Sequence, residues 1–180
     1  MLKLEARELG WISEEVPSEE DRCAHGAVRL EAGGVTFAAP DECRVTMNMA
    51  GLHLLRTLDR NHTQEDRVCG GDPLLPHCAI DIYPDSTNPF GFISIGCPSG
   101  IEFDVVHDGD DVTLRCAAGA AVVPLAAWRA AVVAFCDAVQ ALYDRSPPKS
   151  EPEEHFQREG WRLFWEEWRR RLDAARAAVV

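Results

Sequence analysis

Two histidine and cysteine pairs in this sequence have a spacing that suggests metal binding. Cys23 and His25 are two residues apart, and His77 and Cys78 are adjacent. A structural zinc site combines two closely spaced ligand pairs. Neither pair has a clear second ligand pair elsewhere in the sequence. In addition, adjacent residues of a strand point to opposite faces of a sheet. We therefore expect no metal site.

The common catalytic motifs are absent from the sequence. It has no Gly-x-Ser-x-Gly elbow, no His-x-Glu with Pro-Cys-x-x-Cys, and no phosphate-binding or dinucleotide-binding glycine motif. The segment His107–Asp111 lacks the ligand register of a calcium loop and favours an Asp-Gly hairpin turn. We expect no catalytic residue and no cofactor. A small hydrolase is the alternative, with His53, His77 and His107 and nearby acids as its candidate groups.

The seven cysteines are widely spaced and odd in number, and none belongs to a Cys-x-x-Cys pair. A secreted disulfide scaffold has denser, paired cysteines. We therefore expect small buried thiols in a reducing compartment.

The clearest feature of the central segment is that all of its charged side chains are acidic. No lysine or arginine occurs from Val68 to Leu114, a window of 47 residues that carries eight acids. The whole chain has a formal net charge of −12. Such a field repels nucleic acid and anionic lipid and attracts a basic partner.

Period-two alternation predicts which side chains of this segment face outward. We expect one apolar face against the helices, made of Ile80, Ile82, Ile93, Ile95, Ile101, Phe103, Val105, Val112 and Leu114. The opposite face and the hairpin tip then form a partner-binding surface, because aromatic rings supply buried area and charges steer association. Its predicted residues are Asp81, Tyr83, Asp85, Phe92, Glu102, Asp104, Asp108, Asp110 and Asp111. The alternative is an ordinary solvated face.

Strand patterns occupy the first two thirds of the chain, about residues 27–123. Residues 27–31 and 35–37 predict a hairpin around Gly33 and Gly34, residues 43–49 a strand, and residues 50–60 a helix. Residues 3–12 fit either a strand or a helix, and residues 13–21 a loop. Short connections from Cys78 to Cys116 predict an antiparallel meander.

Helical patterns occupy the last third, about residues 124–178. Pro124 suits a first helical position, and we expect that helix to end near Asp144. A second helix is predicted near Pro152, with Ser150 and Glu153 as a capping pair. Its apolar stripe is Phe156, Trp161, Phe164 or Trp165, Trp168 and Leu172. The sequence therefore predicts one α+β domain over residues 1–180, with an antiparallel sheet packed against C-terminal helices.

The N-terminal residues carry charges throughout, and no stretch reaches the roughly 18 continuous apolar residues that suit a membrane span. We expect a cytoplasmic protein that binds neither membrane nor nucleic acid.

Three segments together suggest a family. They read IEFDVVHDGDDVTL (101–114), VPLAAWRAAVVAFCDAVQALY (123–143) and GWRLFWEEWRRRL (160–172). Their order, and the size and acidity of the chain, resemble the small cytoplasmic immunity proteins of bacterial polymorphic toxins, including toxins delivered by contact-dependent or type VI secretion. The resemblance covers about residues 78–172 and implies a non-enzymatic protein that binds a basic toxin domain and blocks its active site. An adaptor subunit of a larger assembly is a further alternative.

Overall fold

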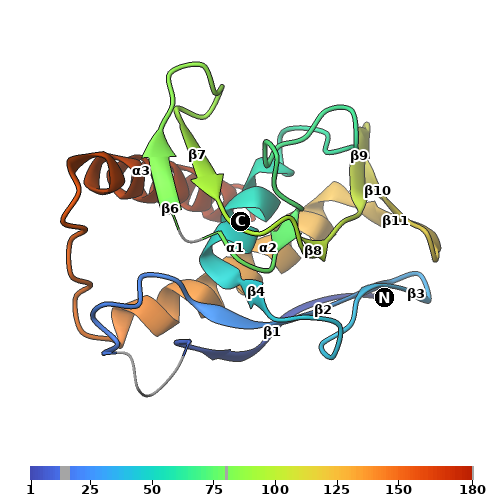
Figure 1. The fold of residues 1–180 in the computed structure, drawn as a ribbon. Coiled ribbons are helices and arrows are strands. Elements are labelled where there is room, and N and C mark those ends of the chain that lie inside the picture. Colours follow the sequence, from blue (N-terminus) through green and yellow to red (C-terminus); the bar gives the residue numbers. More distant parts are fainter. Residues whose placement is uncertain (13–16, 80, 180) are drawn as a thin grey trace.

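Antiparallel strands surround three helices in the computed structural model, which describes residues 1–12, 17–79 and 81–179 (Figure 1). The expected α+β class is confirmed. The strands are β1 Leu2–Gly10, β2 His25–Ala32, β3 Val35–Ala38, β4 Val45–Thr46, β5 Leu75–Pro76, β6 Asp81–Pro84, β7 Phe92–Ile95, β8 Gly100–Ile101, β9 Asp104–Asp108, β10 Asp111–Cys116 and β11 Gly119–Pro124. The helices are α1 Met47–Arg56, α2 Leu125–Asp144 and α3 His155–Ala177.

The N-terminal sheet contains β1, β2, β3 and β4. The β2–β3 hairpin is confirmed, because Gly33 and Gly34 turn the chain with φ values of 59° and 85°. Residues 3–12 fitted two interpretations, and the structure forms a strand there over Leu2–Gly10. Part of the predicted loop 13–21 lies outside the described residues.

Helix α1 runs through the middle of the molecule, and all ten of its residues are buried (Figure 1). It begins at Met47, so the predicted strand 43–49 is wrong except for Val45–Thr46. A helix that is buried on all sides has no solvent-exposed polar face to reveal its period. The alternation of Val45, Met47 and Met49 therefore looked like a strand.

Helix α2 ends at Asp144, as predicted, and buries Trp128, Val132, Phe135, Val139 and Leu142 along one stripe. By length and composition alone, it is the helix among the described residues that could cross a membrane, with a mean hydropathy of 1.4. The buried stripe is the pattern of a core helix that packs inside its own domain.

Helix α3 starts at His155, and no side chain caps its first turn, so the predicted capping pair Ser150 and Glu153 is wrong. The apolar stripe is confirmed at Trp161, Phe164, Trp168 and Leu172 and wrong at Phe156, which is 64% exposed.

Two glycines set the position of α3. A Cβ atom at Gly51 of α1 would lie 2.8 Å from the Trp168 ring, and a Cβ atom at Gly160 would lie 2.1 Å from the Ile82 carbonyl oxygen. A side chain at either position would push the helix away. Helix α3 therefore packs closely against α1 on one side and β6 on another.

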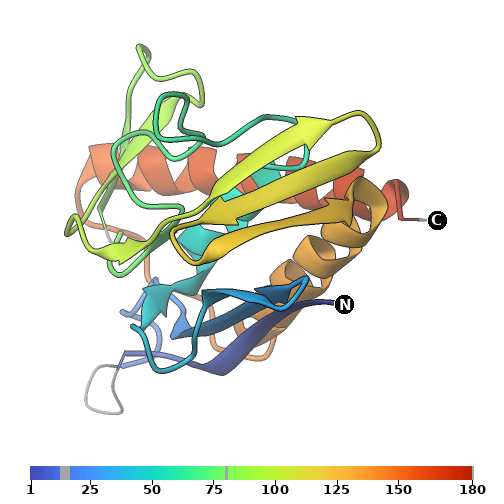
Figure 2. The ribbon, with the colours of Figure 1, turned by 90° about the vertical axis from the view of Figure 1, so that its right-hand side faces the viewer.

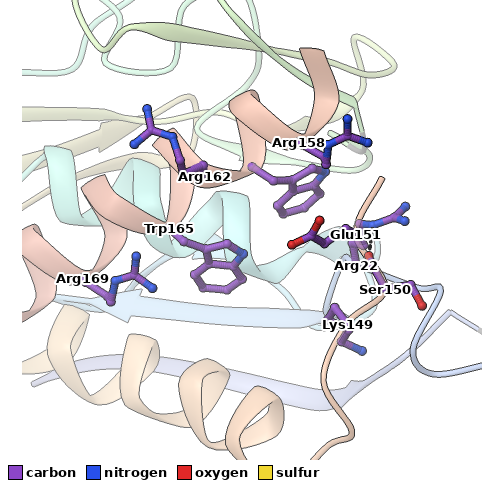
Figure 3. Close-up of a pocket in the computed structure, with 9 residues that line it drawn as sticks. Arg22, Lys149, Ser150, Glu151, Arg158, Arg162, Trp165 and Arg169 are labelled. Atoms are coloured by element: carbon purple, nitrogen blue, oxygen red, sulfur yellow. Dashed lines mark hydrogen bonds between the residues drawn. The ribbon is translucent and has the colours of Figure 1, made fainter. Parts of the chain in front are cut away.

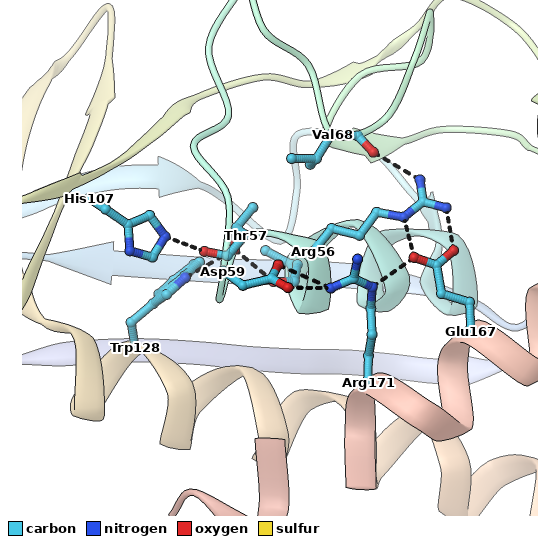
Figure 4. A network of polar contacts seen from close by, with 9 residues as sticks. Arg56, Thr57, Asp59, Val68, His107, Trp128, Glu167 and Arg171 are labelled. Atoms are coloured by element: carbon cyan, nitrogen blue, oxygen red, sulfur yellow. Dashed lines mark hydrogen bonds and ion pairs between the residues drawn. The ribbon is translucent and has the colours of Figure 1, made fainter. Parts of the chain in front are cut away.

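A buried ion pair links the same helices (Figure 4). Arg56 donates to both carboxylate oxygens of Glu167, at 3.0 and 2.6 Å, and to the Val68 carbonyl at 2.8 Å. Arg171 donates to Glu167 at 2.7 Å and to Asp59 at 3.0 Å. The Arg56 and Glu167 side chains are only 4% and 7% exposed.

Strands β5 to β8 form one interrupted ribbon. Asp81 pairs with Ile95, and five residues away along each strand Pro76 pairs with Gly100, so the two ladders share one register. Between them, the His77 N–H still donates to the Ser99 carbonyl in this register, and strand pairing is absent among the described residues at 78–79 and 96–98.

The predicted face of β7 is wrong. Phe92 is 3% exposed, whereas Ile93 and Ile95 are 36% and 51% exposed. The register places Ile82 opposite Ser94, so the buried face carries Ile82 and Phe92. Phe92 therefore packs against Phe164 of α3, with 6.2 Å between the ring centroids. Ile80 lies outside the described residues.

Strands β9, β10 and β11 form a meander with β10 in the centre. The meander predicted from Cys78 to Cys116 is therefore confirmed only at β9 and β10, because β6 and β7 form a separate sheet and β11 lies beyond Cys116. The inner face of β9 and β10 carries the predicted Val105, Val112 and Leu114, all fully buried. Figure 2 shows the three strands side by side at the front of that view.

Candidate functional site

The β9–β10 hairpin ends in three exposed carboxylates. Asp108 and Asp111 are directly opposite each other in the ladder, and Asp110 lies in the loop between them. Gly109 provides the positive φ of 61° at the first loop position, as in a type II′ turn. Like charges directly opposite each other destabilise a sheet. A turn of this type requires glycine at this position, but it requires none of the three acids.

Backbone contacts hold this acidic tip in place. The Asp110 carbonyl accepts from the Leu125 N–H at 2.7 Å, which joins the tip to the start of α2. Next to the tip, the His107 N–H donates to the Asn61 side chain at 2.8 Å, and the His107 ring donates to the Thr57 carbonyl at 2.8 Å (Figure 4). The three carboxylates therefore lie on a fixed frame.

An apolar strip lies beside the tip on the outer surface of the meander. Val106, Thr113 and Val122 are neighbours across the three strands, and Val122 is 66% exposed. An apolar centre with a charged rim is the usual pattern of a protein interface. We call this surface the β9–β11 outer face; its residues are Asp104, Val106, Asp108, Asp110, Asp111, Thr113, Arg115 and Val122.

The other predicted surface residues lie elsewhere. Asp81 and Tyr83 are on β6, in a separate two-stranded ribbon, and Asp81 accepts from Gln157 of α3 at 3.1 Å. Asp85 accepts from the Thr87 backbone and hydroxyl within the turn that follows. Phe92 is buried and is therefore not a surface residue. The predicted continuous surface is thus divided between two sheets.

The Glu102 carboxylate is engaged with other groups of the protein, although the residue itself is exposed. It accepts from the His62 ring at 2.5 Å and from the Leu74 N–H at 3.2 Å. The Val68 N–H donates to His62 Nδ1 at 3.3 Å, so the proton of the neutral ring is on Nε2, facing Glu102. Glu102 therefore orients the buried His62 ring.

The same histidine brings a cysteine into the arrangement. The Cys69 sulfur lies 3.9 Å from His62 Nδ1, so Cys69, His62 and Glu102 follow the order of a nucleophile, a base and an orienting acid. Cys69 also borders a cavity of about 240 Å³ that His53, Arg56 and Ser94 share.

Two features of Cys69 oppose nucleophilic chemistry. Burial raises the pKa of its thiol to about 12, and the charge of Glu102 adds to the shift. The thiol also donates to the Asp72 carbonyl at 2.8 Å. A reactive cysteine needs its thiolate near neutral pH.

The histidines proposed for a hydrolase are not brought together. Burial lowers the pKa of His53 to about 3, and its ring contacts the Leu74 carbonyl at 3.0 Å. His107 is bound to the Thr57 carbonyl, and His77 lies on the interrupted ribbon. Sequence analysis missed His62 and Cys69, because no local pattern connects either residue with Glu102.

A thiol and histidine cluster lies in the ribbon interruption. The candidate ligand atoms of His77, Cys78 and Cys97 are all within 4.8 Å of one another. A hydrogen bond with Cys78 lowers the pKa of the Cys97 thiol to about 6. Burial raises the pKa of Cys43, and nearby negative charge on Glu42 and Cys97 adds to the effect. Sequence analysis had left the His77 and Cys78 pair without a partner. The fold supplies that partner, because the register of the ribbon brings Cys97 close to His77 and Cys78.

A basic cavity of about 280 Å³ lies between α3 and the connection that precedes it (Figure 3). Its cations are largely engaged. Arg22 donates to the Ser150 carbonyl at 2.7 Å, Arg158 to the Pro152 carbonyl at 2.8 Å, and Arg162 to Glu159 at 2.9 Å. The contacts of Arg22 and Arg158 hold the connection between α2 and α3 in place. We therefore assign the cavity a structural role.

Comparison of the chain with protein-family models, curated proteins and solved structures finds no match. The assignment of a function therefore depends on the geometry of the site.

Proposed function

We propose that this protein is a non-enzymatic binding protein that neutralises a basic bacterial toxin domain by occluding it. In this proposal it works in the cytoplasm as an immunity protein, and the β9–β11 outer face is its contact surface. Neither nucleic acid nor membrane is a proposed partner, since the chain has a net charge of −12.

The cross-strand pair of Asp108 and Asp111 is the observation that supports the proposal most strongly. The fold would be more stable with one of these acids neutral, because directly opposed like charges repel. A basic partner would remove that repulsion on binding. The apolar strip of Val106, Thr113 and Val122 would supply the buried area between the charged edges.

Binding kinetics with the domain encoded by the neighbouring upstream reading frame test the proposal. We expect the association rate to fall as salt increases, because charge steers the encounter. The triple change Asp108→Lys, Asp110→Lys and Asp111→Lys should lower that rate at least about tenfold. Val122→Asp should speed dissociation, because it places a charge in the apolar strip.

The matched control is Glu20→Lys, a charge reversal at an exposed acid of the N-terminal loop. It should leave both rates near those of the wild type. Unchanged binding by the triple variant would exclude the outer face as the contact surface.

A cysteine hydrolase is the second candidate function, favoured by the order of Cys69, His62 and Glu102 beside a cavity. The raised pKa of Cys69 makes it the weaker candidate. Cys69→Ser separates the two proposals. Protection against the toxin should survive this change if the protein acts by binding, and should be lost if it acts as a hydrolase.

A further inference from the structure

The ribbon is interrupted just after His77, where Cys78 would be opposite Pro98 in the common register. The Cys97 N–H donates to the Cys78 sulfur at 2.8 Å rather than to a main-chain carbonyl. In this interruption, hydrogen bonds that involve side chains connect the two strands in place of main-chain ladder bonds.

The three side chains converge with dimensions that suit a metal ion. The Cys97 sulfur lies 3.3 Å from His77 Nδ1, and all three candidate ligand atoms lie within 4.8 Å of one another. In a tetrahedral zinc site, Zn–S distances of about 2.3 Å and Zn–N distances of about 2.0 Å place neighbouring ligand atoms roughly 3.5–3.8 Å apart. Small side-chain rotations would bring the three atoms to that spacing.

The surrounding backbone already orients these ligands. The His77 N–H donates to the Ser99 carbonyl at 2.9 Å, and the His77 carbonyl accepts from the Thr46 hydroxyl at 3.3 Å. A Cβ atom at Gly96 would lie 1.9 Å from the Cys78 carbonyl oxygen, so glycine permits the close approach of the two strands. Outer contacts of this kind hold metal ligands in position.

We propose that His77, Cys78 and Cys97 bind one Zn²⁺ ion and that this ion joins the two halves of the interrupted ribbon. Soft thiolates with an imidazole favour zinc over calcium or magnesium. On binding, any proton that remains on either sulfur is released to solvent, and each sulfur forms a bond to the metal. The fourth position is open to water or to a further thiol such as Cys43.

Metal titration of the full-length, reduced, metal-free protein tests the site. We expect one Zn²⁺ per chain by native mass spectrometry and elemental analysis. Co²⁺ should give the visible spectrum of a tetrahedral site together with a thiolate-to-metal charge-transfer band. Cys97→Ser, Cys78→Ser and His77→Ala should each weaken binding by more than about 100-fold, beyond the usual effect of losing an outer contact.

Cys116→Ser is the matched control, since this partly exposed cysteine on β10 lies outside the cluster. It should bind zinc like the wild type. His77 is exposed, so the His77→Ala variant should keep the metal-free melting temperature while losing zinc. With Cys43→Ser, a weaker charge-transfer band identifies Cys43 as the fourth ligand and an unchanged band identifies water; either result supports the site.

A different result would overturn the proposal. Equal zinc uptake by the wild type and the Cys97→Ser variant would place the metal elsewhere, and no uptake by the reduced wild type would exclude the site. A Cys78–Cys97 disulfide that forms in air, in a protein whose reduced form takes up no zinc, would assign the cluster to thiol oxidation. None of these outcomes affects the proposed binding function, because the β9–β11 outer face contains none of the three residues.

Discussion

At the scale of single residues, the acids of the central segment differ in what they contact. Glu102 orients a buried histidine, Asp85 closes a turn, and Asp81 accepts from α3. Asp108 and Asp111 are exposed and face each other. The sequence gives the sign and the density of this charge. It does not show which carboxylates are engaged internally, since those partners lie far away in the chain.

Asp111→Asn should make the protein more stable and its binding weaker. Removing one member of an opposed pair should raise the free energy of unfolding by about 0.2–1 kcal/mol. The same change should slow association with a basic partner. Urea unfolding and binding kinetics measure the two effects. Glu20→Gln, at an exposed acid with no opposed partner in a ladder, should change neither. A loss of stability in Asp111→Asn would show that the acid is needed for the turn.

Cys69 should resist alkylation at neutral pH. Burial raises the pKa of this thiol to about 12, so the thiolate fraction near pH 7 is very small. Iodoacetamide followed by peptide mass spectrometry should leave Cys69 unmodified while the partly exposed Cys116 reacts. Preferential modification of Cys69 would reverse this ranking and favour the hydrolase.

At the scale of elements, local patterns predicted the β2–β3 hairpin, the β9–β10 part of the meander and the stripes of α2 and α3. These elements have one buried and one exposed face, so their period is visible in the sequence. Helix α1 is buried on all sides and was placed three residues too late. The prediction of which β7 side chains are buried was wrong. Which face of this strand points inward depends on its pairing register with β6, and the register cannot be inferred from the sequence alone. For the same reason, only the fold brought Cys97 to His77 and Cys78.

Glu167→Gln should destabilise the junction of α1 and α3 by about 3–5 kcal/mol at pH 7, because it leaves the buried Arg56 charge without its partner. Burial opposes ionisation of Glu167, but hydrogen bonds and charge from Arg56 and Arg171 together lower its pKa below 4.5. A lowered folded-state pKa stabilises the protein above the unfolded value, and this stabilisation disappears as the pH falls through the folded value.

The difference between Glu167→Gln and the wild type should therefore be complete at pH 7 and shrink as the pH falls below about 4. Urea unfolding across this range measures it. Glu166→Gln is the matched control, because Glu166 is exposed and pairs only with the exposed Arg162 among the described residues. A difference that did not change with pH would assign the effect of Glu167→Gln to packing alone.

Truncation after Arg145 should unfold the domain, because α3 supplies the buried Trp161, Phe164, Trp168 and Leu172. Circular dichroism and thermal unfolding of the shortened chain measure the result. A shortened protein that keeps the melting temperature of the full chain would show that α3 is a separable element.

At the scale of the whole molecule, charge is unevenly distributed. The chain has a formal net charge of −12, yet six arginines lie on α3, and three of them, Arg162, Arg171 and Arg176, pair with acids of the same helix or its neighbours. The opposed acids of the β9–β11 outer face have no such pairing in the described residues. The whole-chain charge therefore predicted the sign of a partner, and the fold indicates the surface that would meet it.

The ion pair between α1 and α3 also bears on how the chain is made. Arg56 and Glu167 are 111 residues apart. At translation rates of about 5–20 residues per second, Arg56 is synthesised roughly 5–20 seconds before Glu167. Helix α1, which is buried on all sides in the complete fold, lacks its α3 neighbour throughout that interval. Completion of the core therefore depends on the synthesis of α3, and a nascent chain arrested before α3 would expose to chaperones the side of α1 that α3 covers.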